Sequence, residues 1–281
     1  LTNTQEWKAC VLLPPCVATN RRNTMPGSRL EGKHAVVSGG AAGAGGAASE
    51  VFAREGANVV IVDIQEEAGL TLVKKIREAG GKVSFVRADV SLNDEVDEAI
   101  DKANRLFDNR IDVLFNHAGT VIIKPFLETT ESDWDRMMAI NVKSMFLMTK
   151  AVLPSMLDQG GAIVNTSSIS AVAGTPMEVL YCTSKGACHM VTRAIATEDR
   201  DDGIRCNAVC PGFIRTAHGI RELKELREYG VEVTEEDICR LQGRICEPEE
   251  VANAALFLAS SEASFVNGET MFVDNGMLVR T

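Results

Sequence analysis

Tyr181 and Lys185 place a phenol and an ammonium group four residues apart in a chain of 281 residues. Residues at this spacing are neighbours on one face of a helix. A free tyrosine has a pKa of about 10, which is too high for acid and base catalysis near neutral pH. A neighbouring positive charge favours the phenolate, so we expect Lys185 to lower the pKa of Tyr181. Because a pair at this spacing also arises by chance, its position in the fold must support the assignment.

Polar residues and glycines stand where the predicted strands end. The strand ends in question are Gly43, Asp63, Asp89, Asn116–Gly119, Ser168 and Pro211–Gly212. In an open parallel sheet, ligands bind beyond the carboxyl ends of the strands, near the point where the strand order reverses. Tyr181 opens the helix that follows the fifth predicted strand, so we expect the phenol and these strand ends to form one continuous site.

A glycine-rich turn follows the first predicted strand. It reads Ser38-Gly39-Gly40-Ala41-Ala42-Gly43-Ala44-Gly45 and opens a helix of small residues. Glycine lets such a turn approach a pyrophosphate, whose charge is favoured by the amides at the helix N-terminus. Two other interpretations stay open: close packing of the helix on the strand without a ligand, and an S-adenosylmethionine site, which uses a similar turn.

Asp63 strengthens the dinucleotide interpretation. It closes the second predicted strand, eighteen residues after Gly45, where a carboxylate can accept hydrogen bonds from both hydroxyls of an adenosine ribose. The alternative is a helix-capping role, since Gln65 and Glu66 begin the next helix. Asp89 closes the third strand in the same way, and we expect it either to cap its helix or to bind the adenine ring.

The elements that must hold these residues alternate along the chain. Apolar, strand-like runs are predicted at 35–37, 58–62, 83–86, 111–115, 162–165, 204–209 and 270–273. Stretches with a helical period are predicted at 47–55, 66–79, 94–107, 132–157, 179–200 and 248–258. Continuous apolar strands that alternate with helices are typical of a parallel sheet covered on both faces. We therefore predict an α/β fold, a single doubly wound domain with a seven-stranded parallel sheet over residues 29–281.

Two segments do not fit this alternation. Residues 1–28 show no helix or strand period, and we predict a flexible N-terminal leader, with a targeting segment as the alternative. Residues 214–246 form a long, charged excursion beside the expected site, which we predict to be a mobile substrate lid. Ile220, Leu223 and Leu226 would supply its apolar underside. The alternative is a permanently ordered helical pair that serves only as a subunit contact.

Charge and composition exclude several classes of function. The net charge of −10 repels nucleic-acid phosphates and anionic lipid headgroups, so neither a nucleic-acid nor a membrane partner is expected. No stretch is apolar over the about 20 residues that a membrane span needs. The 8 cysteines lack C-x-x-C pairs and the 4 histidines lack metal-ligand spacing. We therefore expect reduced thiols, a cytoplasmic location and no metal.

These motifs together resemble the short-chain dehydrogenase/reductase family, and the likeness runs from Arg29 to the C-terminus. The matching residues are Ser38-Gly39-x-x-x-Gly43-x-Gly45, Asn116-His117-Ala118-Gly119, Asn141, Ser168, Tyr181-x-x-x-Lys185 and Pro211-Gly212. The chain departs from the family pattern at Ser38, Ala44 and His117, where threonine, isoleucine and asparagine are usual. These departures concern the rigidity of the cofactor loop rather than the activity.

The resemblance implies a Rossmann-type fold and a set of catalytic residues. Tyr181 would be the general acid/base, and Ser168 would hold the substrate oxygen. Lys185 would bind the nicotinamide ribose, and Asn141 would maintain a water-linked proton path. Two of these residues have structural alternatives: Ser168 as a turn cap and Asn141 as a structural hydrogen bonder. We expect His117 to be packed or close to the cofactor rather than catalytic.

The resemblance also implies a cofactor site and an assembly. The residues expected at the cofactor are Ser38, Gly39, Gly43, Ala44, Gly45, Asp63, Ile64, Asp89, Val90, Asn116, Ala118, Gly119, Tyr181, Lys185, Pro211, Gly212, Ile214 and Thr216. A 2′-phosphate would lie against the carboxylate of Asp63, so NAD is the expected cofactor. The terminal segment Phe272–Gly276 resembles the last strand of the family, which usually lies in a subunit contact, and a homotetramer is therefore expected.

The expected function is hydride transfer between NAD and a secondary alcohol or ketone, a small-molecule substrate. A 3-oxoacyl-carrier-protein reductase is the alternative within enzymes, although that reaction usually uses NADPH and a basic docking face. A dinucleotide-binding regulatory protein without turnover is the alternative outside enzymes. A methyltransferase would give no reason for the set of Ser168, Tyr181 and Lys185. The pocket walls are expected to come from the lid and from Thr120, Val121, Ser170, Met177, Glu178 and Phe213.

Overall fold

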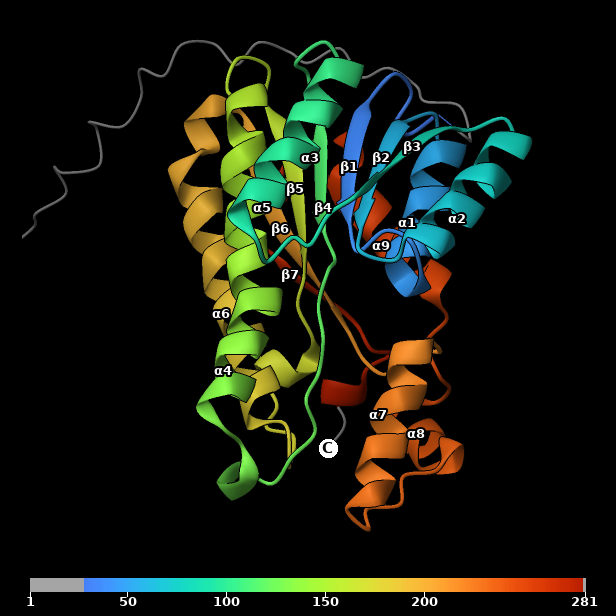
Figure 1. Ribbon diagram of the computed structural model, residues 1–281, viewed down its shortest axis with the longest axis vertical. Helices are drawn as coiled ribbons and strands as arrows, with labels where there is room; N and C mark the ends of the chain where they lie inside the picture. Colours follow the sequence, from blue (N-terminus) through green and yellow to red (C-terminus); the bar gives the residue numbers. More distant parts are fainter. Residues whose placement is uncertain (1–27, 280–281) are drawn as a thin grey trace, which may run out of the picture.

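Seven parallel strands form one sheet, in the order β3-β2-β1-β4-β5-β6-β7, in the computed structural model, which describes residues 28–279 (Figure 1). The strands are β1 (His34–Ser38), β2 (Asn58–Asp63), β3 (Lys82–Arg87), β4 (Val113–Asn116), β5 (Gly161–Thr166), β6 (Ile204–Pro211) and β7 (Thr270–Val273). Every predicted strand is present, with ends that differ by at most two residues. The predicted seven-stranded parallel sheet is confirmed.

Helices cover both faces of this sheet (Figure 1). One face carries α1 (Gly43–Arg54), α2 (Glu66–Glu78) and α9 (Pro248–Ala259). The other face carries α3 (Asn93–Leu106), α5 (Ser144–Val152) and α6 (Val179–Glu198). Each parallel strand returns to the sheet through such a helix, which explains the alternation along the chain.

Alternate residues of each central strand supply the two apolar cores. In β1, Ala35 and Val37 belong to the core on the side of α1 and α9, whereas Val36 belongs to the core on the side of α3 and α5. Successive strand residues point to opposite faces. Because both faces are buried, the strands are continuously apolar instead of alternating between apolar and polar residues.

The helix predicted at 132–157 is present but contains a π-helical turn that was not predicted, and its last α-helical residue is Val152. A π-helical turn, Ala139–Lys143, separates α4 (Glu131–Met138) from α5. Asn141 lies in this turn and is buried. Single π-turns inside helices are frequent at functional sites, and a hydrophobic period of 3.6 residues does not reveal them.

The excursion 214–246 contains two helices, α7 (Ala217–Glu228) and α8 (Glu235–Gln242), which project beyond the carboxyl ends of the strands (Figure 1). An isolated bridge between Ile214 and Cys246 closes the base of the excursion. The segment is therefore a helical pair held at its two ends, next to the region where ligands bind in this type of sheet.

The underside of α7 packs on the loop that follows β4. Leu226 is buried against Val121 and Ile123, and Leu223 packs beside them, as predicted. The prediction for Ile220 was wrong, since this side chain is 66% exposed. With 3.6 residues per turn, Ile220 lies about 120° around the helix from Leu226, so the two cannot cover the same surface.

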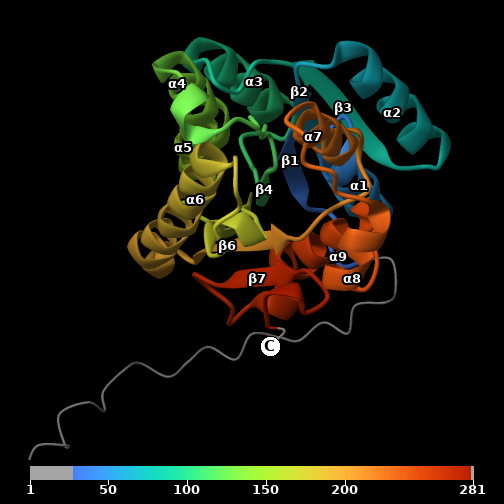
Figure 2. The ribbon, with the colours of Figure 1, turned by 90° about the horizontal axis from the view of Figure 1, so that it is seen from below.

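The strand order reverses between β1 and β4, and Figure 2 looks onto the sheet edge where these strands end. Ser38 at the end of β1 is in register with Asn116 at the end of β4. The Ser38 Oγ accepts hydrogen bonds from the backbone N–H groups of His117 at 3.2 Å and Ala118 at 3.4 Å. The glycine-rich turn and the loop after β4 are thus fixed to each other at the point where ligands bind.

The predicted leader, residues 1–28, lies outside the described residues except for Ser28. Within 28–279, no helix combines the length and the apolar character that crossing a bilayer requires. The same residues include six cysteines without a disulfide and contain no group of three His, Cys, Asp or Glu side chains that could hold a metal ion.

Candidate active site

Tyr181 lies in the first turn of α6, directly beyond the end of β5. The half-buried phenol has a pKa raised above its usual value, mainly because its surroundings exclude water. A hydrogen bond with Ser168 acts in the opposite direction and lowers the pKa of Tyr181, while the charges of Glu222 and Glu178 raise it further. Ser168 therefore belongs to the electrostatic surroundings of the Tyr181 phenol.

Lys185 lies one turn further along α6 and is buried. Its Nζ donates a hydrogen bond to the backbone oxygen of Thr166 at 2.9 Å and lies 5.6 Å from the centre of the Tyr181 ring. Burial lowers the pKa of Lys185. The expectation that Lys185 lowers the pKa of Tyr181 differs from the structure, where burial and the two carboxyl groups raise that pKa.

Ser168 and Asn141 show the structural roles considered for them. Ser168 caps a short 3-10 turn, because its Oγ accepts from the N–H of Ser170 at 3.1 Å. Asn141 holds the loop after β4: its Oδ1 accepts from Thr120 N at 2.7 Å, and its Nδ2 donates to Ser184 Oγ at 2.9 Å. Asn141 is thus a structural hydrogen bonder. Its position in the π-turn directs its side chain at the loop after β4.

Gly119 brings the catalytic candidates together. A Cβ built on Gly119 would lie 3.4 Å from Asn141 Oδ1 and 3.5 Å from Lys185 Nζ. The predicted positions 119, 141 and 185, which come from three different elements, therefore meet at one point beyond the carboxyl end of β4. A side chain at position 119 would be in contact with both polar groups.

The start of α1 has the features of an anion site. Its N-cap residue, Ala42, forms no side-chain cap, and the first turn carries no acidic residue, so backbone N–H groups of this turn are left without a capping partner. Gly43 has a φ of +56° and faces Thr216, whose Cγ2 would be 3.4 Å from an added Cβ. These features fit the pyrophosphate of a dinucleotide.

Gly39 and Gly45 are required by packing inside the same turn. A Cβ on Gly45 would lie 2.1 Å from the backbone oxygen of Gly39, and a Cβ on Gly39 would lie 2.7 Å from Ala118 Cα. Ala44 is buried under the turn. The packing interpretation of the glycines is therefore correct for these two positions, and it is compatible with a ligand in front of Gly43.

Asp63 is held by the chain on both sides. Its Oδ2 accepts from Ala41 N at 3.0 Å and its Oδ1 from Gln65 N at 2.9 Å. A carboxylate has about four acceptor positions, so these two contacts leave capacity for ribose hydroxyls. Ile64, the next residue, is exposed beside it. The capping and ribose roles proposed for Asp63 do not exclude each other.

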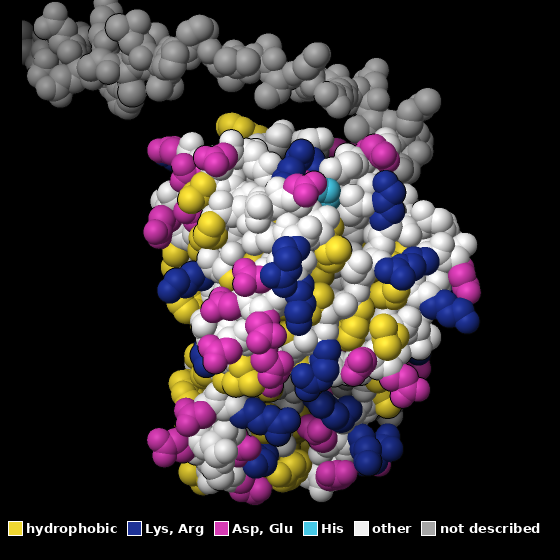
Figure 3. Space-filling view, turned by 45° about the horizontal axis from the view of Figure 1, so that its top comes forward, with side chains coloured by type: hydrophobic (Ala, Val, Ile, Leu, Met, Phe, Trp, Pro, Cys, Tyr) yellow, Lys and Arg dark blue, Asp and Glu magenta, His cyan; other side chains and the backbone are white. Residues whose placement is uncertain are grey.

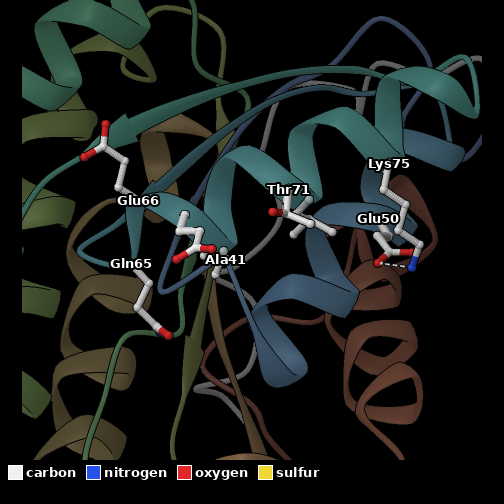
Figure 4. A pocket seen from close by; sticks show the side chains of 9 residues that line it. Ala41, Glu50, Gln65, Glu66, Thr71 and Lys75 are labelled. Carbon is white, nitrogen blue, oxygen red and sulfur yellow. Dashed lines mark hydrogen bonds and ion pairs between the residues drawn. The ribbon is translucent and has the colours of Figure 1, made fainter.

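An open groove of about 650 Å³ lies between α1 and α2, beside the glycine-rich turn (Figure 4). It is lined by Ala41, Glu50, Gln65, Glu66, Glu67, Ala68, Thr71, Leu72 and Lys75. Its cation, the Lys75 ammonium, is paired with the Glu50 carboxylate at 2.7 Å, as the dashed line in Figure 4 shows. The charged side chains that line this groove are therefore predominantly acidic.

The remaining predicted cofactor residues divide into two groups. Asp89 forms a local turn, accepting from the N–H and the hydroxyl of Ser91 at 2.9 and 2.7 Å, and Val90 is buried beside it. Asn116 points into the sheet, where its Nδ2 donates to Asn165 Oδ1 at 2.9 Å. These three residues shape the strand ends by contacts within the protein.

The second group borders the excursion 214–246. Pro211 ends β6, and the N–H of Gly212 donates to Val273 O at 3.2 Å. Ile214 forms the bridge at the base of the excursion. Thr216 caps α7 by accepting from Gly219 N at 3.1 Å. Thr216 therefore lies between α7 and the glycine-rich turn, which it faces at Gly43.

His117 is packed, as expected. Its Nδ1 lies 3.0 Å from Thr166 Oγ1, and its ring lies 5.3 Å from that of Phe115. Burial, reinforced by the positive charges of Lys185 and His218, lowers the pKa of His117 to about 3. The imidazole is therefore neutral at physiological pH and cannot act as an acid there.

Two carboxyl groups beside Tyr181 were not assigned a role from the sequence. Glu178, expected only as part of a pocket wall, is 4% exposed, and burial together with the charge of Glu222 raises its pKa to about 8. Glu222 was expected to be solvated on α7. Instead it is half-buried, and burial together with the charge of Glu225 raises its pKa to about 7. A charged helix gives no sign of which residues face inwards.

The raised pKa of Glu178 predicts a pH-dependent stability. Its folded-state pKa of about 8 exceeds the value of about 4.3 for an unfolded chain. Between these pH values the folded state holds a proton that the unfolded state releases, so the free energy of unfolding falls as pH rises through this window. Glu178→Gln cannot ionise. We expect its melting temperature, relative to the wild type, to be higher by several degrees at about pH 9 than at about pH 5. A difference that is the same at both pH values would contradict the assignment.

Comparisons with known proteins agree with this geometry. A family profile described as "Enoyl-(Acyl carrier protein) reductase" matches residues 39–278. The chain is 41% identical to "Dehydrogenase/reductase SDR family member 6" of Aquarana catesbeiana, covering 88% of this chain and 98% of that protein. It is 39% identical to "Cyclopentanol dehydrogenase" of Comamonas sp. (strain NCIMB 9872), with the same coverage. It is 37% identical to a 3-oxoacyl-[acyl-carrier-protein] reductase of Thermotoga maritima, covering 89% and 100%.

A solved structure agrees as well. Levodione reductase superimposes with a TM-score of 0.85 at 30% identity, covering 90% of this chain and 100% of the other. The sheet order, the glycine-rich turn and the residues around Tyr181 match the family that the sequence resembles. The chain belongs to the short-chain dehydrogenase/reductase family, whose members use nicotinamide cofactors, and it is an oxidoreductase that acts on CH–OH groups.

Proposed function

We propose that this protein is an NAD-dependent dehydrogenase that interconverts a secondary alcohol and a ketone, with Tyr181 as the general acid/base. The observation that carries the proposal is the arrangement of Ser168, Tyr181 and Lys185 at the carboxyl edge of the sheet, beside an uncapped helix N-terminus. The experiment that tests it is reduction of NAD by a panel of secondary alcohols. A dinucleotide-binding protein without turnover would bind the cofactor and reduce none of it.

The residues of the turn and of the strand ends would hold the cofactor. The amides at the start of α1, near Gly43, would bind the pyrophosphate, Asp63 would accept from the adenosine ribose, and Lys185 would donate to the nicotinamide ribose. When bound, the nicotinamide accepts or supplies the hydride. The protein's own contribution is to bind both reactants in a fixed orientation and to move one proton.

Tyr181 and Ser168 would share the proton chemistry. The positive charge of a bound oxidised nicotinamide would favour the phenolate of Tyr181 against the effect of burial. In alcohol oxidation this phenolate would take the hydroxyl proton of the substrate, and in ketone reduction the phenol would return it. The Ser168 hydroxyl would donate to the same substrate oxygen and stabilise its developing charge. Asn141 would act by holding Thr120 and the loop after β4 in place.

The acidic surroundings of the ribose site support NAD rather than NADP. The Asp63 carboxylate faces the backbone of the glycine-rich turn at Ala41. In the adjoining groove, Lys75 is engaged by Glu50 and does not offer an unpaired cation. A 2′-phosphate would therefore meet carboxylates without a compensating charge.

A 3-oxoacyl-carrier-protein reductase is the second candidate function. The family profile and the relative from Thermotoga maritima favour it. The net charge of −10 opposes docking of an acidic carrier protein, and acidic and basic side chains are interspersed on the face seen in Figure 3. Turnover of a 3-oxoacyl thioester with NADPH, faster than that of any simple ketone with NADH, would favour this candidate.

We further propose that residues 214–246 act as a mobile lid. Leu226 and Leu223 lie against the loop after β4, and Arg221 Nη2 donates to Thr120 Oγ1 at 3.3 Å and to Val121 O at 3.4 Å. A segment that opens and closes over the site would make and break these few contacts between α7 and the loop after β4. We expect amide hydrogen exchange across 214–246 to slow when NADH and a substrate analogue are both present. Unchanged protection in the ternary complex would favour a static helical pair.

The expected homotetramer and cytoplasmic location remain proposals. Trp134 on α4 and Phe146 on α5 are exposed, and Phe146 lines a shallow hollow of about 350 Å³ together with Met138 and Val142. Phe272 on β7 is also partly exposed. Such surfaces suit contacts between identical subunits, and the free thiols among residues 28–279 suit a reducing compartment.

A further inference from the structure

Glu178 is held in an unusual position directly before α6. The preceding residue, Met177, has a φ of +66°, a conformation that non-glycine residues rarely adopt. Its backbone oxygen accepts from Lys124 N at 3.0 Å, which fixes the strained turn. Backbone strain of this kind is retained where the surrounding structure imposes it, often at functional sites. Here it sets the direction of the Glu178 side chain.

The Glu178 carboxyl group is poorly paired for a buried group. Among the described residues, its hydrogen bonding is limited to Ser170 Oγ, which donates at 3.5 Å, and it forms no ion pair with them. That Oγ is also 3.3 Å from Thr175 Oγ1, and either of these two hydroxyls can be the donor. A buried carboxyl group without a strong partner is costly to the fold. A ligand that supplies hydrogen-bond donors would remove this cost.

Glu222 approaches the same region from the lid. It is half-buried and directly precedes Leu223, which packs against the same cluster as Tyr181. Its charge acts on both Tyr181 and Glu178. The neighbouring cation on α7, Arg221, is engaged by Glu225 at 3.4 Å and by the loop after β4. The space beside the reacting phenol is thus bounded by acidic groups from the sheet side and from the lid.

We infer that Glu178 and Glu222 determine substrate specificity by selecting alcohols or ketones that carry a second hydrogen-bond donor, a hydroxyl or a protonated amine, away from the reacting carbon. This inference rests on the proposed function and names the substrate class of the same site. Carboxyl oxygens accept from such donors, and the bonds are strongest when donor and acceptor are charged. Above about pH 8, where both groups are ionised, they would repel a carboxylate on the substrate.

The apolar wall opposite completes the expected shape of the substrate. Tyr181, Met177 and Leu223 all pack against the cluster of Val121, Ile123 and Leu226, so the body of the substrate would be hydrocarbon while its far end is polar. Small sites of this kind combine apolar walls with a few polar groups that fix orientation. A hydroxylated or aminated ring of modest size fits this description.

Four cyclohexanols that differ only at carbon 3 test the inference. The substituents are a hydroxyl, an amine, a methoxy group, which keeps the oxygen and lacks the donor, and a carboxylate. We expect kcat/KM for the diol and the amino alcohol to exceed that for the methoxy compound by about tenfold or more, as for a lost hydrogen bond to a charged group. The carboxylate should be the poorest substrate above about pH 8.

Variants separate the two carboxyl groups from general effects. Glu178→Gln and Glu222→Gln should each lower the preference for the amine over the methoxy compound and improve use of the carboxylate. Glu228→Gln removes an exposed carboxylate from α7, the helix that carries Glu222. It should change neither the preference for the amine over the methoxy compound nor the use of the carboxylate. Equal use of all four compounds by the wild type, or ratios unchanged in both glutamine variants, would overturn the inference.

A binding measurement distinguishes failure of this inference from failure of the proposed function. Calorimetry of 3-aminocyclohexanol with the wild type and NAD, in two buffers of different ionisation enthalpy, counts the protons released on binding. The ammonium group should ionise Glu178, so protons are released by the wild type and fewer by Glu178→Gln. If no alcohol is oxidised, the proposed function fails, while proton release still decides the role of Glu178. Binding without proton release would contradict that role.

Discussion

Tyr181→Phe should lose at least about 100-fold in kcat, because general acid/base catalysis contributes about 10²–10⁴-fold. The substitution removes one hydroxyl and keeps the ring that packs against the cluster of Val121, Ile123 and Leu226. Binding of NADH should be nearly unchanged, since the hydroxyl acts on the proton of the substrate. Steady-state kinetics and a fluorescence titration with NADH measure the two effects separately.

The chain offers a matched control for this experiment. Its other tyrosine, Tyr229, ends α7 at the surface, and Tyr229→Phe removes the same hydroxyl away from the catalytic group. We expect it to keep wild-type kcat within a small factor. Lys185→Ala, in contrast, should weaken both turnover and NADH binding. A Tyr181→Phe enzyme that retains more than about a tenth of wild-type kcat would assign the proton transfer to another group.

Cofactor selection should be the second large effect. Two like charges about 4 Å apart, at an effective dielectric constant near 20, repel by about 4 kcal/mol, which corresponds to about a thousandfold in affinity. We therefore expect kcat/KM for NAD to exceed that for NADP by this order, because the 2′-phosphate would lie against Asp63. Kinetics with the two cofactors, at fixed ionic strength, measure the ratio.

Two substitutions sharpen the cofactor experiment. Asp63→Ser should narrow the preference by removing the repulsion, while the backbone contacts of Ala41 and Gln65 lose their acceptor and weaken the turn. Asp101→Ser removes an exposed carboxylate from α3 and should leave the preference unchanged. Equal catalytic efficiency of the wild type with both cofactors would show that Asp63 does not discriminate between a 2′-hydroxyl and a 2′-phosphate.

The fold could be predicted from sequence because its signals are local. Buried parallel strands appear as apolar runs, and the glycine-rich turn marks where the first strand meets its helix. The π-turn at Asn141 could not be found in this way, because it inserts into a helix without disturbing the apolar pattern on either side. The same limit applies to Ile220, where a helical period places the residue near the apolar face and the packing of α7 leaves it in water.

The placement of the candidate residues was more predictable than their electrostatics. Tyr181 and Lys185 lie one turn apart on α6, as their spacing indicates. The pKa of Tyr181 was not predictable, because it depends mainly on burial and in part on the charge of Glu222, which lies 41 residues further along the chain on α7. Sequence spacing shows which side chains lie on the same helix or strand. The electric field at a phenol depends instead on which helices and loops pack around it in the folded chain.

The most direct measurement is the near-ultraviolet absorbance of reduced nicotinamide when the wild type and Tyr181→Phe are incubated with NAD and a panel of secondary alcohols. We predict that the wild type reduces NAD with at least one alcohol of the panel, and that Tyr181→Phe binds the cofactor and reduces it at least about 100-fold more slowly. No turnover by the wild type with any alcohol, or with the matching ketones and NADH, while calorimetry shows the cofactor bound, would contradict the account.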